Sequence, residues 1–302
     1  MQKVSLDSTD LKILNLLAKN CRLSYRSIGH TVRLTTKSVK SRVDRMLAAK
    51  VIERFLARVN PSVIGYKRTY SFALRKSKLN QEIFGRINLV GDIQYQFEVM
   101  GGVIGFSIAI KEGTEDKIDL LLNSLKPALL GLIQSHNREV HQKLTKTDYT
   151  IMKQLIKNPR MEIRDIAAAT SISPKTVRRR LDKMIRNHVI EFSIQPNPDA
   201  MKGHIVFFLD VKVKHRSQYQ KVLQRIYEEL HEHFMLSSDL SNQEDSIGLL
   251  LGSEDAIGIE SIRSKIESFE EVQQANAFLP IRLSSPQEWI LKAIDRKLVE
   301  SS

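Results

Sequence analysis

The chain has 302 residues, 42% of them hydrophobic, which suffices for two or more globular domains of about 100 to 200 residues. Its apolar runs are far shorter than the ~18 residues of a membrane span, its first residues lack the apolar stretch of a signal peptide, and its single cysteine, Cys21, excludes an intrachain disulfide and a thiolate metal cluster. Because such segments are missing, we expect a cytoplasmic protein with no membrane partner. The net charge of +13 suggests a polyanionic partner.

The first module, residues 1–61, is predicted to be a winged helix-turn-helix, with three short helices followed by a hairpin. Asp7 and Asp10 have the spacing of a helix start, and a second helix is expected near residues 25–31. A third helix is predicted to begin near Thr36, and the β-prone residues after Val51 would form the hairpin.

Residues 62–141 have a different pattern, which predicts a ferredoxin-like domain of the sensor type. Alternating and helical periodicities follow one another in the order β-α-β-β-α-β. The predicted elements are a strand at 68–75, a helix at 81–88, a hairpin of 95–100 and 104–110 around Gly101-Gly102, a helix at 116–125 and a strand at 129–134.

The second half of the chain repeats the first. Residues 6–53 align without a gap against 144–191, a shift of 138, with identity at 18 of the 48 positions. Solenoid repeats run roughly 20 to 50 residues, so this period indicates a duplicated domain. We predict a second winged helix-turn-helix at 142–198, with Ser173 and Pro174 beginning its third helix, and a second β-α-β-β-α-β domain at 199–285. An amphipathic helix at 286–302 would pack on a sheet or on a partner.

Positive charge follows the repeat. Residues 1–60 carry +9 and residues 142–198 carry +7, whereas residues 61–141 carry +2 and residues 199–302 carry −5. Charge that serves only solubility has no reason to follow a repeat, so the two modules are expected to contact a polyanion.

The third helix of each module has one apolar and one basic face. The expected buried stripes are Val39, Val43 and Met46 in the first copy and Val177, Leu181 and Met184 in the second. Such a helix can place side chains on base edges in the major groove of DNA while Lys and Arg neutralise phosphates. The predicted DNA-binding residues are Lys37, Ser38, Lys40, Ser41, Arg42 and Arg45, and in the second copy Lys175, Thr176, Arg178, Arg179, Arg180, Lys183 and Arg186.

A solvated helix face is the alternative, but such a face normally mixes signs. Here only Asp44 and Asp182 are acidic, and each could pair with the residue four before it. The copies also differ at an outward position, where Ser41 in the first corresponds to Arg179 in the second. We therefore predict that the two helices read an asymmetric DNA site.

These motifs resemble the Lrp/AsnC family of transcriptional regulators. The resemblance rests on Leu-Asp-x-x-Asp, then Lys-Ser/Thr-Val-x-x-Arg-Val/Leu-Asp-x-Met, then Val-Ile-Glu and Asn-Pro, and both copies carry the later motifs. It implies a winged helix-turn-helix followed by a sensor domain that dimerises through its sheet and binds an amino acid. Arg42 and Arg180 match the family's arginine on the recognition helix.

The chain departs from the family pattern at two places. Lys50 and His188 stand where the family has a glycine in a left-handed turn, so these turns are expected to be mildly strained or differently shaped. In the sensor hairpin, Gly101 and Gly102 mark a possible effector loop, but Ile104 occupies the position of the family's aspartate. These glycines could equally be turn residues, and the effector is unknown.

We predict a sequence-specific regulator that binds promoter DNA, with no catalytic residues, metal or cofactor. Its partners would be double-stranded DNA and itself, as a pseudo-dimer within the chain or as a homodimer. Two alternatives remain open. One is an architectural chromatin protein of low sequence specificity. The other is a decarboxylase of iron tetrapyrroles (siroheme type), which a related branch of the fold resembles and which would use histidines near the domain junctions, namely His136, His141, His188, His204 and His215.

Overall fold

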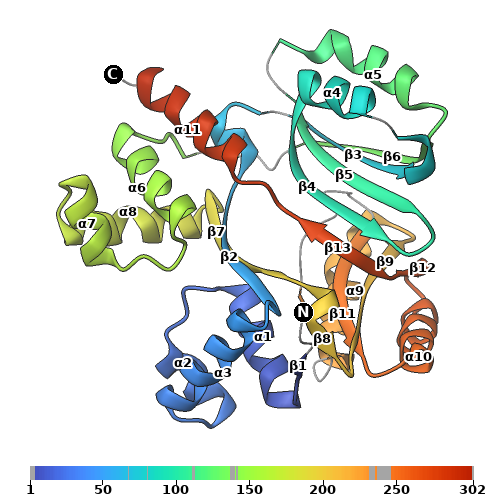
Figure 1. Cartoon of the computed structure of the whole chain (residues 1–302), viewed down its shortest axis with the longest axis horizontal. Helices are drawn as coiled ribbons and strands as arrows, with labels where there is room; N and C mark the ends of the chain where they lie inside the picture. Colours follow the sequence, from blue (N-terminus) through green and yellow to red (C-terminus); the bar gives the residue numbers. More distant parts are fainter. Residues whose placement is uncertain are drawn as a thin grey trace.

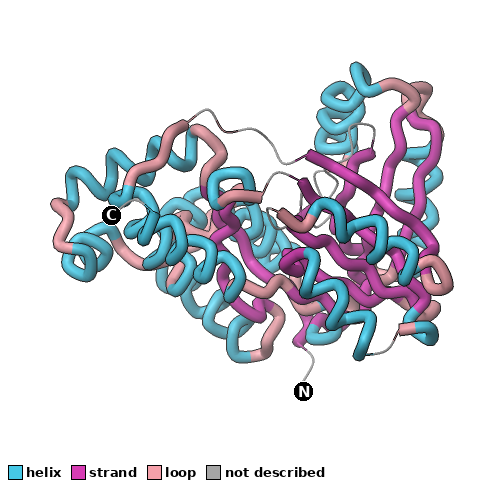
Figure 2. The backbone as a smooth tube through the Cα atoms, turned by 90° about the horizontal axis from the view of Figure 1, so that it is seen from above, coloured by secondary structure: helices cyan, strands magenta, loops and turns pink. Residues whose placement is uncertain are grey.

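A computed structural model of the chain describes residues 4–66, 68–79, 81–110, 113–136, 140, 142–230, 235–236 and 246–300. Two helical modules lie on one side of the molecule and two sheets on the other (Figure 1, Figure 2). The predicted α+β fold is confirmed. None of the described helices is both long and apolar enough to cross a membrane.

Each module contains the three predicted helices. They are α1 (Ser8–Lys19), α2 (Tyr25–Val32) and α3 (Thr36–Ala48) in the first, and α6 (Lys146–Lys157), α7 (Ile163–Thr170) and α8 (Pro174–Arg186) in the second. Capping boxes begin α1 and α6, because Asp10 and Asp148 each accept a hydrogen bond from the N-cap backbone. Ser173 caps α8 and Pro174 is its first residue, as predicted.

The strands that follow the third helices pair with each other. β2 (Ile52–Val59) and β7 (Ile190–Pro196) form an antiparallel ribbon, in which Ala57 lies opposite Phe192. The prediction of a hairpin within each module is therefore wrong. Each strand ends at a 3-10 turn, η1 (Pro61–Ile64) or η4 (Pro198–Ala200), so its own module offers no neighbouring strand and the other module supplies one.

The first sheet has the predicted β-α-β-β-α-β order and one additional strand. Its elements are β3 (Arg68–Arg75), α4 (Gln81–Val90), β4 (Gly91–Val99), β5 (Val103–Ile110), α5 (Ile118–Leu125) and β6 (Leu129–His136). The strand order is β13-β4-β5-β3-β6. Both helices lie over one face of this sheet (Figure 1). On the other face the ring of Phe97 lies over Gly105, where a Cβ atom would come within 2.1 Å of that ring.

The second sheet repeats this arrangement. It contains β9 (Ile205–Val213), α9 (Tyr219–Glu229), β10 (Met235–Leu236), β11 (Ser246–Ser253), α10 (Ala256–Glu267) and β12 (Val272–Phe278), in the order β10-β11-β9-β12. The second strand was predicted at 234–240, of which only 235–236 is described. Short 3-10 turns precede α4, α5 and α9, namely η2 (Lys76–Lys78), η3 (Glu115–Lys117) and η5 (Arg216–Gln218).

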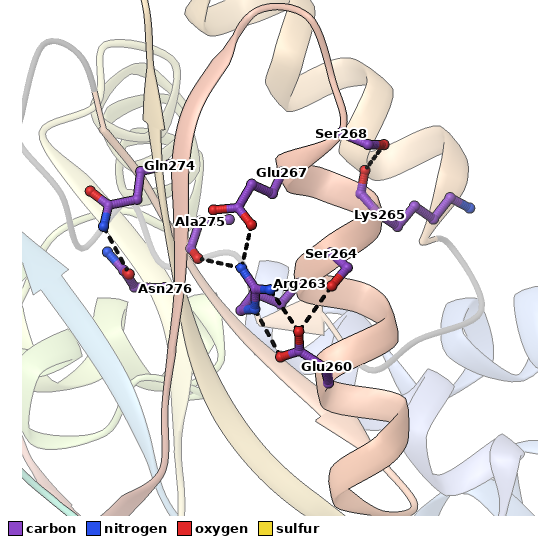
Figure 3. A network of polar contacts seen from close by, with 9 residues as sticks. All are labelled: Glu260, Arg263, Ser264, Lys265, Glu267, Ser268, Gln274, Ala275 and Asn276. Carbon is purple, nitrogen blue, oxygen red and sulfur yellow. Dashed lines mark hydrogen bonds and ion pairs between the residues drawn. The ribbon is translucent and has the colours of Figure 1, made fainter.

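The outer face of α10 carries a network of charged side chains (Figure 3). Arg263 donates hydrogen bonds to Glu260 and Glu267, and it also reaches the carbonyl of Ala275 in β12. The hydrogen bonds from Arg263 and then from Ser264 lower the pKa of Glu260 to about 2. The network thus ties α10 to the edge strand of its own sheet, on the outside of the molecule.

The two halves of the chain are joined by segments that cross between them. β13 (Pro280–Ser284) lies in the range predicted for the second sensor-type domain, yet it pairs with β4 of the first sheet. Likewise β1 (Val4–Ser5) pairs with β8 (Met201–Lys202). The final helix, α11 (Glu288–Glu300), packs against α6 and η1, and not on a sheet.

One hydrophobic core runs through both modules. Leu14 of α1 and Met152 of α6 belong to the same buried cluster, together with Ile52 and Ile190 of the ribbon. Each sheet has a separate core beneath its own helices. The two modules therefore form a single packed body and not two bodies on a linker.

Candidate nucleic-acid interface

The helices α3 and α8 present their basic faces because their apolar stripes are buried. The stripe of α3 is fully buried, at Val39, Val43 and Met46. The equivalent residues of α8 are at most 3% exposed, namely Val177, Leu181 and Met184. The predicted stripes are thus confirmed. In both copies the turn into the helix uses a left-handed residue, Arg33 or Ser171, each with φ of 57°.

Most of the predicted DNA-binding side chains lie at the surface. In α3, Lys37, Lys40, Ser41 and Arg45 are exposed, whereas Ser38 and Arg42 are partly buried. In α8, Lys175, Arg178, Arg179, Lys183 and Arg186 are exposed, whereas Thr176 and Arg180 are partly buried. An open groove of about 500 Å³ follows α3, lined by Thr35, Lys37, Ser38, Ser41, Arg42 and Arg45.

Arg42 and Arg180 are directed at the first helix of their own module. Arg42 Nη1 donates to Asp7 Oδ2 at 2.7 Å and to Asp10 Oδ1 at 2.8 Å, and Arg180 Nη1 donates to Asp148 Oδ2 at 3.2 Å. Both acceptors Asp10 and Asp148 are at most 1% exposed. These two arginines join the third helix of each module to its first helix, and their role as DNA contacts stays a prediction. The repeated Asp and Arg, 32 residues apart in each copy, are the sequence signal for this pair.

In the first module, more of the cations on the third helix are paired with acidic residues than in the second module. Arg45 also donates to Asp10, and Lys40 Nζ lies 2.5 Å from Asp44, as predicted. Burial acts to raise the pKa of Asp7, but the hydrogen bonds from Arg42 and from backbone N–H groups outweigh it, so the pKa is lowered.

In the second module, Lys183 replaces Arg45 and makes no ion pair with Asp148. The predicted pair of Arg178 with Asp182 is not formed between these described side chains. The five exposed cations of α8 therefore have no acidic partner within the described residues, namely Lys175, Arg178, Arg179, Lys183 and Arg186.

Two equivalent arginines, one in each module, bind the backbone of the opposite module. Arg22 and Arg160 occupy equivalent positions of the repeat, and each reaches into the other module. Arg22 Nη1 donates to the carbonyl of Pro159 at 2.6 Å, and Arg160 donates to the carbonyls of Cys21 and Leu23. The Arg160 guanidinium also lies 4.6 Å from the centre of the Tyr25 ring. Together with the β2–β7 ribbon, these contacts fix α3 and α8 relative to each other.

Lys50 and His188 adopt the left-handed conformation that the family's glycine would adopt. Their φ angles are 61° and 53°. Backbone hydrogen bonds from Val51 to Met46 and from Val189 to Met184 complete a Schellman motif after each third helix. The turn therefore keeps its usual shape. The backbone of Lys50 and of His188 is strained, because a residue with a Cβ atom is disfavoured in the left-handed conformation.

Glycine at either position is expected to stabilise the protein by about 1 kcal/mol, because glycine adopts this conformation without steric cost. Urea unfolding of Lys50→Gly and His188→Gly measures the gain. The neighbouring Ala49 has a right-handed backbone with φ of −78°, so Ala49→Gly should have the opposite sign. Destabilisation by Lys50→Gly would show that the turn is not strained.

The possible effector loop is a tight turn in the structure. Gly101 and Gly102 join β4 to β5 with φ angles of 91° and 75°, and a Cβ atom at either position would have no described atom within 4 Å outside the turn. These conformations favour glycine at both positions, so their role as turn residues accounts for them.

Two of the junction histidines have described contacts. His188 lies beside Glu191, and His204, which follows the second module, contacts the carbonyl of Leu6 in the first module. The described residues hold no cluster of metal ligands.

Comparisons with known proteins agree with this architecture. Residues 6–47 match the AsnC-type helix-turn-helix domain, and residues 144–191 match a winged helix-turn-helix DNA-binding domain. The HTH-type transcriptional regulator Ptr1 of Methanocaldococcus jannaschii is 29% identical over 124 residues, which cover 40% of this chain and 83% of that protein. The HTH-type transcriptional regulator Rv2324 of Mycobacterium tuberculosis is 44% identical over 61 residues, or 20% of this chain and 41% of that protein.

A solved structure shares the whole arrangement. The siroheme decarboxylase NirDL has a TM-score of 0.50 at 11% identity, with 97% of this chain and 100% of that chain covered. At this identity the likeness shows a common fold and carries no activity with it. The helix-turn-helix matches in both halves and the similarity to HTH-type transcriptional regulators support a DNA-binding regulator of the Lrp/AsnC type with two helix-turn-helix units in tandem.

Proposed function

We propose that this DNA-binding regulator reads promoter DNA sequence-specifically through α3 and α8, and that α8 supplies the larger share of the electrostatic attraction. The observation that carries the proposal is the difference in ion pairing between two otherwise similar helices. Lys40 and Arg45 of α3 are neutralised by Asp44 and Asp10 within the same module. The five exposed cations of α8 remain available to phosphates and bases.

This difference has a direct effect on DNA affinity. A cation that binds a phosphate releases a condensed counterion, whereas a cation that already has a carboxylate partner must first break that pair. Arg179 can also donate two hydrogen bonds to guanine, and its equivalent Ser41 cannot. We therefore expect one half-site bound strongly and the other weakly.

Salt dependence tests the electrostatic part of the proposal. If the two modules together neutralise about eight phosphates, the logarithm of the affinity should fall against the logarithm of the salt concentration with a slope near −7. Fluorescence anisotropy of a labelled duplex at about 50 to 200 mM salt gives this slope. A flat salt response would contradict a role for the basic faces.

We also propose that one chain acts as the two-module unit. The ribbon and the reciprocal arginines already hold α3 and α8 together, so no second chain is needed to pair them. Helix-turn-helix pairs engage half-sites about one helical turn apart, ~34 Å, or multiples of it. Light scattering combined with footprinting distinguishes a monomer that protects about two turns of DNA from a dimer that protects four or more.

Two other functions are distinguished by separate experiments. The shared fold with NirDL raises the possibility of tetrapyrrole binding, and an absorbance titration with an iron tetrapyrrole tests it directly. Tight stoichiometric binding, without binding of DNA, would favour an enzyme. An architectural protein would instead bind all duplexes with nearly equal affinity, so the ratio of specific to non-specific affinity identifies it.

A further inference from the structure

A partly enclosed cavity lies where the β2–β7 ribbon meets the two sheets. Its volume is about 60 Å³, which is room for about five water-sized groups. Strands from both halves of the chain form its wall: β2, β4, β7, β9, β11 and β13. The cavity therefore exists only because the two units fold against each other.

Arg58 of β2 is the one charged side chain that lines this cavity. Its guanidinium forms no hydrogen bond or ion pair with any described residue. Burial lowers the pKa of Arg58, and the nearby Glu191, which lies opposite it in the ribbon, offsets only part of this effect. An arginine that is partly buried without a carboxylate hydrogen-bonded to its guanidinium is unfavourable by itself, so an anionic ligand would satisfy it.

The rest of the wall is mainly apolar. Phe97 and Phe208 meet edge to face with ring centres 5.3 Å apart, and Leu56 of β2 and Leu250 of β11 also line the cavity. No carboxylate lines the cavity, so an ammonium group placed there would have no anionic partner in its wall. Ser284 at the end of β13 and the following Ser285 also line the cavity.

We propose that this cavity binds a short-chain monocarboxylate that has no ammonium group. Its carboxylate would accept charge-assisted hydrogen bonds from Arg58, and its alkyl chain would lie against Phe97 and Phe208. The volume admits an acid of about six non-hydrogen atoms, such as butyrate. β2 directly follows α3, and β7 directly follows α8. The ligand would therefore contact both the strands that follow the recognition helices and the strands of the two sheets.

Isothermal titration calorimetry of the full chain tests this proposal without DNA, so the outcome is independent of the proposed regulatory function. Three probes share one chain length: butyrate, the neutral butyramide, and 2-aminobutyrate, which adds an ammonium group. At constant ionic strength, butyrate should bind at one site, and the other two should bind at least about tenfold more weakly. Absence of butyrate binding, or equal affinity for butyramide or 2-aminobutyrate, would overturn the proposal.

Variants locate the site. Arg58→Met should lower butyrate affinity at least about tenfold while keeping the melting temperature at or above that of the wild type, because it removes an unpaired charge. Arg282→Met removes the same charge from an exposed position of β13 outside the cavity, and it should bind butyrate normally. Ser284→Phe, which fills the cavity from β13, should abolish binding independently of Arg58. Undiminished affinity in Arg58→Met or in Ser284→Phe would overturn the assignment.

Discussion

Replacing Arg178 and Arg179 together with alanine is expected to weaken binding to a specific duplex about a hundredfold. Both side chains are exposed on α8 without an acidic partner among the described residues, so each can contact a phosphate or a base edge at no cost in broken ion pairs. Alanine is a strong helix former, so α8 itself should be preserved. Fluorescence anisotropy titrations at one fixed salt concentration measure the loss.

The matched control is the equivalent pair in the first module, Lys40→Ala with Ser41→Ala. Lys40 is already paired with Asp44, and Ser41 carries no charge, so this variant should lose less than about tenfold in affinity. The salt slope should also become shallower by about two in the α8 variant, and by less in the control. Equal losses of DNA affinity in the two variants would show that the ion pairs within the first module do not reduce its contribution to DNA binding.

Loss of the carboxylate of Asp10 is expected to destabilise the protein by about 3 kcal/mol in Asp10→Asn, measured by urea unfolding. Asp10 is 1% exposed and accepts from Arg42, from Arg45 and from the backbone N–H of Asp7. Removing one partner of a buried pair leaves the other charges poorly solvated, which typically costs 3–5 kcal/mol. The partial exposure of both arginines reduces that cost here.

Asp148→Asn in the second module provides the comparison. Asp148 has a single arginine partner, Arg180 at 3.2 Å, and its Oδ1 atom lies buried without a hydrogen bond in the described structure. We expect about half the destabilisation of Asp10→Asn. A larger effect at Asp148 than at Asp10 would mean that the number of ion pairs does not determine the stability of these helix junctions.

Local signals predicted the helices of both modules. The capping residues Asp7 and Ser173 and the buried stripe of Val39, Val43 and Met46 act within one helix, so their spacing in the sequence is sufficient. The ribbon was missed because β2 and β7 are separated by more than 130 residues. A β-prone segment shows that a strand forms, but its periodicity does not identify the partner strand. β13 was not predicted as a strand, and its partner β4 lies far earlier in the chain.

The candidate site was predicted to a similar extent. Helical periodicity correctly placed Lys175, Arg179 and Lys183 on the exposed face of α8. It could not show that Arg42 turns towards Asp10, because that contact depends on how α3 packs on α1. The ion pairs between helices therefore decide which of the predicted cations lack an acidic partner, and helical periodicity alone does not identify these pairs.

Selection of binding sites from a random duplex library, followed by sequencing, tests the central claim most directly. Two modules held in fixed positions within one chain, with unequal recognition helices, should select an asymmetric site. We expect one half-site with strongly preferred bases opposite α8 and a second, weakly specified half-site at a constant spacing of one or two helical turns. A perfect palindrome with equally specified half-sites would contradict the account.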